Sequence, residues 1–226
     1  MHIGILQCGH FPTGKGHPKQ TYGDLYTEFL KERGLTFQTW SVVDMDFPDS
    51  PLVADGWLLS GSKHGAYEDL PFIAPLERFV RDAYAAKVPL VGICFGHQMI
   101  AQALGGKVEK FSDGWSLGRQ IYDLEGKSVA LNAWHQDQVT RTPKDARTIG
   151  SNELCKHAAL AYEGRAFSVQ AHPEFTDDHV SLLLDVRRAA LDEDQAAAVR
   201  ANLGKPLSNT ELAERITAFF KEPAHV

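Results

Sequence analysis

Short apolar runs alternate with helical segments along the first half of this 226-residue chain, and this alternation most restricts how the chain can fold. Strands are expected at residues 3–8, 35–43, 55–60 and 88–93, where the apolar runs have strand length. Helices are expected between and after them, at residues 21–33, 71–86 and 96–104, because Thr21 and Pro71 suit helix starts and Gly34 and Gly105 suit helix ends. This order favours an α/β fold with a largely parallel central sheet.

The pattern changes after Gly106, where strand candidates follow one another without helices between them. We expect antiparallel hairpins from strands at residues 107–111, 118–124, 128–134, 146–151 and 158–162, and a last apolar strand at residues 166–171. The rest of the chain is expected to be helical, with Ser208 and Glu211 forming a capping box. The prediction is a three-layer α/β/α fold in one domain, residues 1–226, with a core at 1–175 and a helical extension at 176–226.

Charge and composition argue against several kinds of partner. The chain has 23 Lys and Arg against 29 Asp and Glu, and its net charge is −6, which disfavours nucleic acids and anionic membranes. Residues 88–95 are too few to span a bilayer, and the N-terminus lacks the pattern of a secretion signal. Three cysteines without such a signal indicate reduced thiols and a cytoplasmic location.

The strongest local motif is Gly-Ile-Cys-Phe-Gly at residues 92–96, between an expected strand and an expected helix. It is the cysteine form of the Gly-x-Ser-x-Gly nucleophile elbow, in which the glycines permit a sharp turn around a strained central residue. The turn would place the Cys94 sulfur at a helix N-terminus, where the helix dipole and free N–H groups favour the thiolate. The alternative is a buried, inert cysteine.

A cysteine nucleophile needs a base and a group that orients the base. His172 and Glu174 follow the last expected strand in the sequence Ala-His-Pro-Glu. Pro173 biases His172 toward an extended conformation, in which residues two apart point the same way. Because strand ends gather at one edge of a parallel sheet, we expect His172 and Glu174 to lie near Cys94.

These motifs resemble the class I (triad-type) glutamine amidotransferases, whose fold is flavodoxin-like. The resemblance rests on Cys-Phe-Gly-His-Gln at residues 94–98 and His-Pro-Glu at residues 172–174, and it covers about residues 1–175. It implies that Cys94 attacks the side-chain amide of glutamine, that His172, oriented by Glu174, protonates the departing ammonia, and that water hydrolyses the glutamyl thioester. By the same likeness, the N–H groups of Gly61 and Phe95 would stabilise the oxyanion. Gly61 could instead be only a strand-ending turn.

The resemblance also implies a glutamine pocket. Gln98 and the segment Trp-His-Gln-Asp-Gln-Val at residues 134–139 are similar to family segments that line it. Trp134, His135 and Asp137 are the expected contacts, since the α-ammonium and α-carboxylate of glutamine need acceptors and donors. For Asp137, a solvated hairpin turn is the alternative.

Two other patterns point to no ligand. Residues 9–16 nearly match the phosphate-binding loop Gly-x4-Gly-Lys-[Ser/Thr], but Gly16 stands where a magnesium-binding hydroxyl is required. The remaining candidates, His2, Cys8, His10, His17 and His64, have no spacing typical of a closed zinc site. We therefore expect neither a metal nor a cofactor.

Three functions stay open on the sequence. The first is a glutaminase-type amidotransferase acting on glutamine, alone or with a separate synthase subunit. The second is a gamma-glutamyl peptidase, which would use the same chemistry on γ-glutamyl peptide bonds. The third is a binding or regulatory module without catalysis, against which the intact Cys94, His172 and Glu174 argue. A homodimer is also open.

Overall fold

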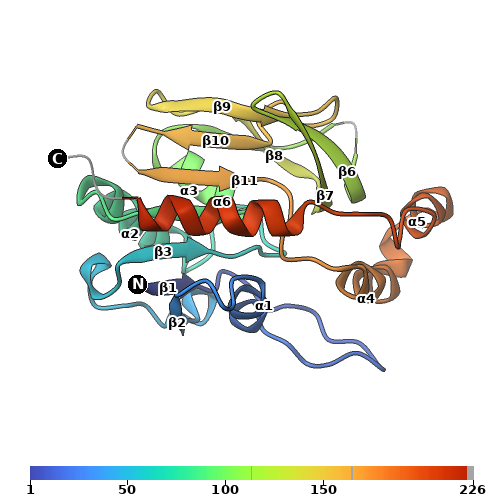
Figure 1. Ribbon diagram of the computed structural model, residues 1–226, viewed down its shortest axis with the longest axis horizontal. Helices are drawn as coiled ribbons and strands as arrows, with labels where there is room; N and C mark the ends of the chain where they lie inside the picture. Colours follow the sequence, from blue (N-terminus) through green and yellow to red (C-terminus); the bar gives the residue numbers. More distant parts are fainter. Residues whose placement is uncertain (113, 164, 223–226) are drawn as a thin grey trace.

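The computed structural model describes residues 1–112, 114–163 and 165–222, and within them nine strands form one sheet in the order β2-β1-β3-β4-β11-β10-β9-β6-β7 (Figure 1). The first five strands in that order are parallel. They are β2 (Thr36–Trp40), β1 (His2–Leu6), β3 (Gly56–Leu59), β4 (Leu90–Ile93) and β11 (Ala166–Val169). The central strand β11 is thus the last strand along the sequence.

The other four strands extend this sheet in antiparallel pairs. They are β10 (Ala159–Tyr162), β9 (Ala146–Ser151), β6 (Ser116–Leu124) and β7 (Lys127–His135). A separate two-stranded ribbon joins β5 (Lys107–Lys110) to β8 (Asp137–Arg141). The sequence analysis missed β8, because Val139 is its one apolar residue and leaves no periodicity to detect.

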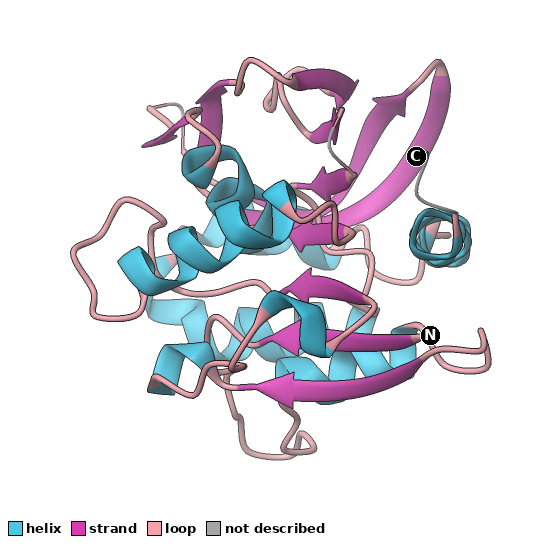
Figure 2. Cartoon of the chain, turned by 90° about the vertical axis from the view of Figure 1, so that its left-hand side faces the viewer, coloured by secondary structure: helices cyan, strands magenta, loops and turns pink. Residues whose placement is uncertain are grey.

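Helices cover both faces of the sheet, as Figure 2 shows. The helices are α1 (Tyr22–Phe29), α2 (Ile73–Ala85), α3 (Phe95–Ala103), α4 (Asp177–Arg187), α5 (Glu193–Arg200) and α6 (Asn209–Lys221), with 3-10 turns η1 (Val42–Asp44), η2 (Pro51–Val53) and η3 (Arg188–Ala190). One core cluster joins the sheet to α1 and α6, and a second joins it to α2 and α3. The predicted three-layer α/β/α fold is confirmed.

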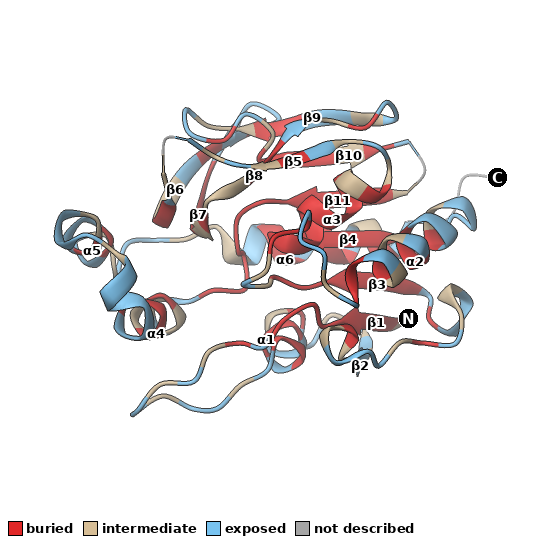
Figure 3. Cartoon of the chain, turned by 180° about the vertical axis from the view of Figure 1, so that it is seen from behind, coloured by how far each residue is buried: buried red, intermediate tan, exposed pale blue. Residues whose placement is uncertain are grey.

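The sequences of the inner parallel strands account for their position between two helical layers, whereas the edge strand β2 has no buried residue. In β1, Ile3 and Ile5 face the first core cluster and Leu6 faces the second. Every residue of β4 is buried, as expected for a strand covered on both faces. Figure 3 shows buried residues along β1, β3, β4 and β11 and on α3.

The predicted helix limits are mostly right, but two details differ. Thr21 caps α1 as predicted, with its hydroxyl accepting from the Asp24 N–H at 3.1 Å, although the helix ends at Phe29. The predicted capping box at Ser208 is wrong. The Ser208 hydroxyl accepts instead from the N–H of Ala130 in β7 at 3.1 Å, which ties the start of α6 to the sheet.

Helices α4 and α5 pack on β6 at the antiparallel end of the sheet, whereas Phe220 of α6 packs over Gly56 of β3. Val180 and Leu184 of α4 form a small core cluster with Val199 of α5 and Leu117 of β6. Among the described residues, no helix has the length and apolar character needed to cross a bilayer.

Candidate active site

Cys94 occupies a strained turn between β4 and α3. Its φ of 53° and ψ of −104° lie in a region that a residue with a side chain rarely adopts. Its N–H donates to the carbonyl oxygen of Val169 in β11 at 2.9 Å, which fixes the turn to the central strand. The side chain is 4% exposed and faces the cavity described below.

The two glycines of the motif are required by close backbone packing. A Cβ at Gly92 would lie 2.5 Å from the carbonyl oxygen of Gly96, and a Cβ at Gly96 would collide with the carbonyl oxygen of Leu59 in β3. The Gly96 N–H donates to the Ser60 carbonyl at 3.1 Å. The turn is thus held by its own glycines and by the loop after β3.

His172 lies just beyond β11, at the carboxyl edge of the parallel strands. Its N–H donates to the carbonyl oxygen of Asn132 in β7 at 2.8 Å. Its ring lies parallel to that of Phe175, with centroids 3.9 Å apart, and its Nδ1 lies 2.7 Å from Oε1 of Glu174. Both side chains are buried, so the His172 ring is held on one face by Phe175 and at Nδ1 by a carboxylate.

A second bond holds the Glu174 carboxylate. The hydroxyl of Tyr26 in α1 donates to its Oε1 at 2.9 Å, while Oε2 has no hydrogen-bond partner in the described part of the chain. Burial, followed by the Glu174 charge, raises the pKa of Tyr26 well above its usual range, so this hydroxyl keeps its proton. The sequence analysis did not find Tyr26, because nothing in the amphipathic pattern of α1 separates it from an ordinary core residue.

The surroundings of His172 favour its charged form. Burial alone opposes protonation, but the Glu174 carboxylate and the Cys94 side chain outweigh it and raise the His172 pKa to about 10. Burial has the opposite result at His97 and His135, whose pKa it lowers to about 3. The site therefore combines one charged imidazole next to Cys94 with two neutral ones.

The predicted oxyanion donors lie on either side of Cys94, but one already has a partner. The Gly61 N–H points to the Tyr26 hydroxyl at 3.4 Å, and a Cβ at Gly61 would lie 2.7 Å from Cε1 of His172. The next residue, Ser62, lines the cavity with Cys94. Within the described residues, neither the Ser62 N–H nor the Phe95 N–H has a hydrogen-bond partner.

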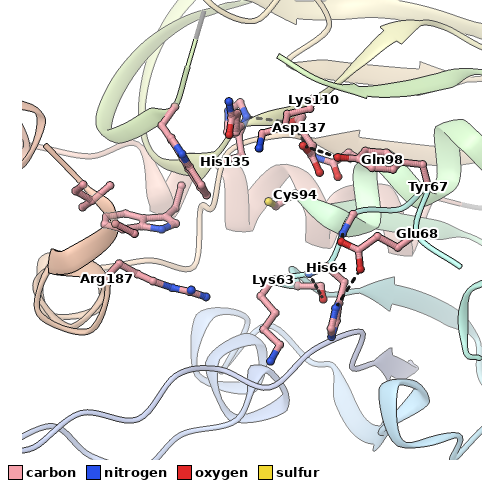
Figure 4. A pocket seen from close by; sticks show the side chains of 17 residues that line it. Lys63, His64, Tyr67, Glu68, Cys94, Gln98, Lys110, His135, Asp137 and Arg187 are labelled. Carbon is pink, nitrogen blue, oxygen red and sulfur yellow. Dashed lines mark hydrogen bonds and ion pairs between the residues drawn. The ribbon is translucent and has the colours of Figure 1, made fainter. Parts of the chain in front are cut away.

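A cavity of about 330 Å³ opens over the Cys94 sulfur (Figure 4). It contains the four residues predicted to contact the substrate, namely Gln98, Trp134, His135 and Asp137. Most of its wall comes from the loop after β3, at residues 62–65, 67 and 68, from Lys110 and Trp115, and from residues 134–137, and the tail supplies Arg187, Ala190 and Leu191. The contribution of the tail was not foreseen.

Gln98 and Asp137 are connected at one end of the cavity. The Gln98 side-chain amide donates to the Asp137 carbonyl oxygen at 2.9 Å, and the Asp137 carboxylate accepts from the Tyr67 hydroxyl at 3.1 Å. Burial raises the pKa of Asp137 above its usual range. Asp137 is the first residue of β8, so the predicted alternative of a solvated hairpin turn is wrong.

The side chain of Gln170 was also missed by the sequence analysis. It is fully buried at the end of β11, and its amide lies 3.6 Å from the Cys94 sulfur and 3.2 Å from the Gln98 side chain. Gln170 directly follows β11 and lies two residues before His172, and both side chains reach the Cys94 side chain. That spacing is a signal that sequence reasoning could have used.

The N-terminal loop and three of the candidate metal ligands, His2, His10 and His17, lie outside this arrangement, whereas His64 lines the cavity. Gly14 of the loop packs against Leu182 of α4, and His17 lies 3.6 Å from the Asp185 carboxylate. The Cys8 thiol is buried, and all three cysteines are free. Over the described ranges, no group of three or more His, Cys, Asp or Glu side chains is arranged to hold a metal ion.

Comparison with known proteins gives consistent matches. The family model for "Glutamine amidotransferase class-I" matches residues 21–180. The chain is 29% identical over 187 residues to gamma-glutamyl peptidase 3 of Arabidopsis thaliana. The matched region covers 74% of this chain and 75% of that protein. It is 31% identical over 218 residues to the glutamine-hydrolyzing GMP synthase of Proteus mirabilis, covering 81% of this chain but 40% of the relative. The crystal structure of a glutamine amidotransferase from Thermotoga maritima has the same fold, with a TM-score of 0.79 at 17% identity over 98% of each chain.

Proposed function

The chain belongs to the class-I glutamine amidotransferase family, as its motifs predicted, and from this premise we propose that it is a cysteine hydrolase of γ-glutamyl amides with Cys94, His172 and Glu174 as its catalytic residues. One observation carries the proposal. A strained turn presents Cys94 beside a buried imidazole whose pKa is raised by Glu174 and Cys94, so the imidazole is placed to take the proton of the Cys94 thiol and to give it to the leaving group.

The reaction has two steps. The Cys94 sulfur bonds to the γ-carbonyl carbon of glutamine, the carbon–nitrogen bond breaks, and His172 gives its proton to the departing nitrogen, which leaves as ammonia. Water then attacks the γ-glutamyl thioester, a proton returns to the Cys94–His172 pair, and glutamate is released. Glu174 does not exchange a proton in this scheme. It orients the imidazole through the 2.7 Å bond to Nδ1.

The negative oxygen of the tetrahedral intermediate needs fixed donors. Phe95 remains one proposed donor, with its N–H at the start of α3. For the other we propose Ser62 in place of Gly61, because the Gly61 N–H points to Tyr26 whereas the Ser62 N–H has no partner in the described structure. Gly61 keeps a role, since any side chain there would displace His172.

The glutamyl head group would occupy the end of the cavity formed by Gln98 and Asp137. The Asp137 carboxylate is an acceptor for the α-ammonium, and His135 lies beside it, whereas Trp134 lines the cavity toward the tail. Because tail residues also line this cavity, we propose that the core and the helical extension act as one domain.

A second candidate function is cleavage of γ-glutamyl peptides, in which an amino acid or peptide leaves in place of ammonia. The observation that favours it is the extension of the cavity from Cys94 to the tail residues Arg187 and Leu191, beyond what an amide nitrogen occupies. The match to gamma-glutamyl peptidase 3 over most of both chains supports it. Under the first function, a separate synthase subunit is the proposed consumer of ammonia, as the GMP synthase relatives suggest.

Glutamate release from glutamine and from γ-glutamyl dipeptides tests the proposal. Cys94→Ala should abolish release from every substrate and leave the circular dichroism spectrum unchanged, whereas Cys155→Ala, at another buried free cysteine, should retain activity. His172→Asn should cost more activity than Glu174→Gln. Release that survives in Cys94→Ala would refute the mechanism, and a folded wild-type protein inactive on all substrates would favour the non-catalytic module.

A further inference from the structure

The cavity continues on both sides of the Cys94 sulfur (Figure 4). Gln98, Tyr67, Glu68 and Asp137 lie toward one end, where amide and carboxylate oxygens gather. Arg187 extends into the cavity from the opposite side. A γ-glutamyl substrate with its carbonyl carbon at Cys94 would likewise be divided into two parts, the glutamyl group and the leaving group.

The two ends differ in charge. The first end holds the carboxylates of Asp137 and Glu68, which suit the ammonium of the glutamyl group. The opposite end holds the Arg187 guanidinium next to Ala190 and Leu191. We propose, as an extension that rests on the proposed hydrolase function, that Arg187 binds the free carboxylate of the leaving amino acid, so that the preferred substrates are γ-glutamyl peptides whose leaving residue carries its own α-carboxylate.

Arg187 is suited to bind a ligand because the protein does not occupy its charge. Across the described ranges it makes neither an ion pair nor a hydrogen bond with the protein, whereas Arg81, Arg147, Arg200 and Arg215 each pair with a glutamate. A guanidinium presents a planar set of donors that matches a carboxylate with two parallel bonds.

The charge of Arg187 also reaches the reaction centre. Burial and the negative charges of Cys94 and Glu174 raise the pKa of Tyr22, and Arg187 is the cation that opposes this rise. The Tyr22 hydroxyl lies 3.0 Å from the Cβ position of Gly61, which is also next to the His172 ring. Arg187 and Cys94 line the same cavity of about 330 Å³, so a substrate with its carbonyl carbon at Cys94 can place the carboxylate of its leaving group toward Arg187.

The other cations of the cavity are less suited to this role. The charge of Lys110 acts on Asp137 and so belongs to the glutamyl end. Lys63 and Arg187 are both exposed, but Lys63 lies on the loop after β3 and carries a compact ammonium on a flexible stem. Arg187 instead ends α4, whose Leu182, Leu183 and Leu184 are buried in the core, so its backbone is held in place before any substrate binds.

The wall near Arg187 contains apolar groups as well as charge. Leu191 and Trp134, together with the exposed Trp115, line the cavity with Arg187 and Ala190. A carboxylate at the guanidinium would leave the side chain of the leaving residue against these apolar groups. The expected substrates therefore have an uncharged leaving residue, such as alanine or a larger apolar amino acid.

The test compares γ-glutamylalanine with γ-glutamylalanine amide, which lacks only the carboxylate. The variant is Arg187→Gln. The matched control is Arg188→Gln, since Arg188 is the adjacent exposed arginine and is not among the residues of the cavity wall. Two quantities are measured: kcat/KM for both compounds, and their dissociation constants by calorimetry in the Cys94→Ala background, in which no turnover is expected.

In Arg187→Gln we expect the preference for γ-glutamylalanine over its amide to fall about tenfold. The loss should be seen both in KM and in the dissociation constant. Arg188→Gln should keep the wild-type preference. An equal preference in wild type and Arg187→Gln, or an equal loss for both compounds, would overturn the inference. Absence of turnover in wild type would refute the hydrolase function alone. Calorimetry would then still test the role of Arg187. If the Cys94→Ala protein binds γ-glutamylalanine and its amide equally well, Arg187 does not bind the carboxylate and the inference is refuted.

Discussion

The Tyr26 hydroxyl stabilises the buried Glu174 carboxylate by a hydrogen bond. It donates to Oε1 of Glu174 at 2.9 Å and accepts from the Gly61 N–H at 3.4 Å. Tyr26→Phe removes this oxygen and keeps the ring, so no cavity of appreciable size forms. The carboxylate would keep only its bond to His172, because Oε2 has no partner in the described part of the chain.

The size of the effect follows from these two contacts. A buried hydrogen bond to a charged group contributes about 1.5–3 kcal/mol to stability, and the longer bond from the Gly61 amide adds roughly 0.5–1 kcal/mol. We expect Tyr26→Phe to lower the free energy of unfolding by about 3 kcal/mol. For a chain of this length that corresponds to a fall in Tm of roughly 6–12 °C.

Tyr22→Phe is the matched control, because its ring stacks with that of Tyr26 at 6.2 Å but its hydroxyl makes no hydrogen bond to the described residues. Removing a hydroxyl that has no partner in the protein is close to neutral, so this variant should lose about 1 kcal/mol or less. Urea unfolding at pH 7, followed by circular dichroism, measures both. If the two variants differ by less than about 0.5 kcal/mol, the carboxylate does not depend on Tyr26 and the reasoning is wrong.

Three further predictions concern the turn, the buried histidines and the core. Gly96→Ala should prevent native folding or cost more than about 3 kcal/mol, since its Cβ meets the Leu59 carbonyl; wild-type urea stability would contradict the proposed geometry. His97 and His135, with pKa lowered to about 3, bind protons only when unfolded, so a fall from pH 6.5 to pH 5 should reduce the free energy of unfolding by about 3 kcal/mol; equal stabilities at these two pH values would contradict their burial as neutral rings. Phe220→Ala in α6, at a fully buried position, should cost about 3–5 kcal/mol, and a loss below 1 kcal/mol would show that α6 does not cover the sheet.

The sign of the pH prediction follows from the direction of each shift. A histidine whose pKa is lowered on folding leaves stability intact above its unfolded pKa of about 6.5 and reduces it as the pH falls toward 3. His172 is raised instead, so its contribution is fully present below about pH 6.5 and is lost as the pH rises toward 10. His172 therefore does not offset the acid effect of His97 and His135 between pH 6.5 and pH 5.

Local patterns were enough to predict the parallel half of the fold. Apolar runs of strand length, glycine stops and the cap at Thr21 are short-range features, and each survives in the structure within a few residues. The juxtaposition of Cys94 with His172 was also predictable, because the ends of parallel strands meet at one edge.

What the sequence could not predict depends on contacts between distant segments. The β8 ribbon exists because β5 pairs with it, not because of its own composition. The Ser208 hydroxyl could accept from an N–H in the first turn of α6 or from the Ala130 N–H in β7. The second bond forms because α6 packs against the sheet. Arg187 enters the cavity because α4 and α5 pack on β6. The hydrophobic periodicity of the tail does not show that it packs on this strand.

The central position of β11 has a consequence for how the protein is made. β4 needs β11 as its neighbour, yet about 70 residues must be synthesised between the end of one and the start of the other. At 5–20 residues per second, a ribosome takes roughly 4–14 seconds to do this. During that interval the nascent chain carries an apolar strand with an open hydrogen-bonding edge, which favours pairing with other chains. Slow codons between residues 93 and 166 would lengthen this exposure, whereas a chaperone that covers β4 at the tunnel exit would protect the growing sheet.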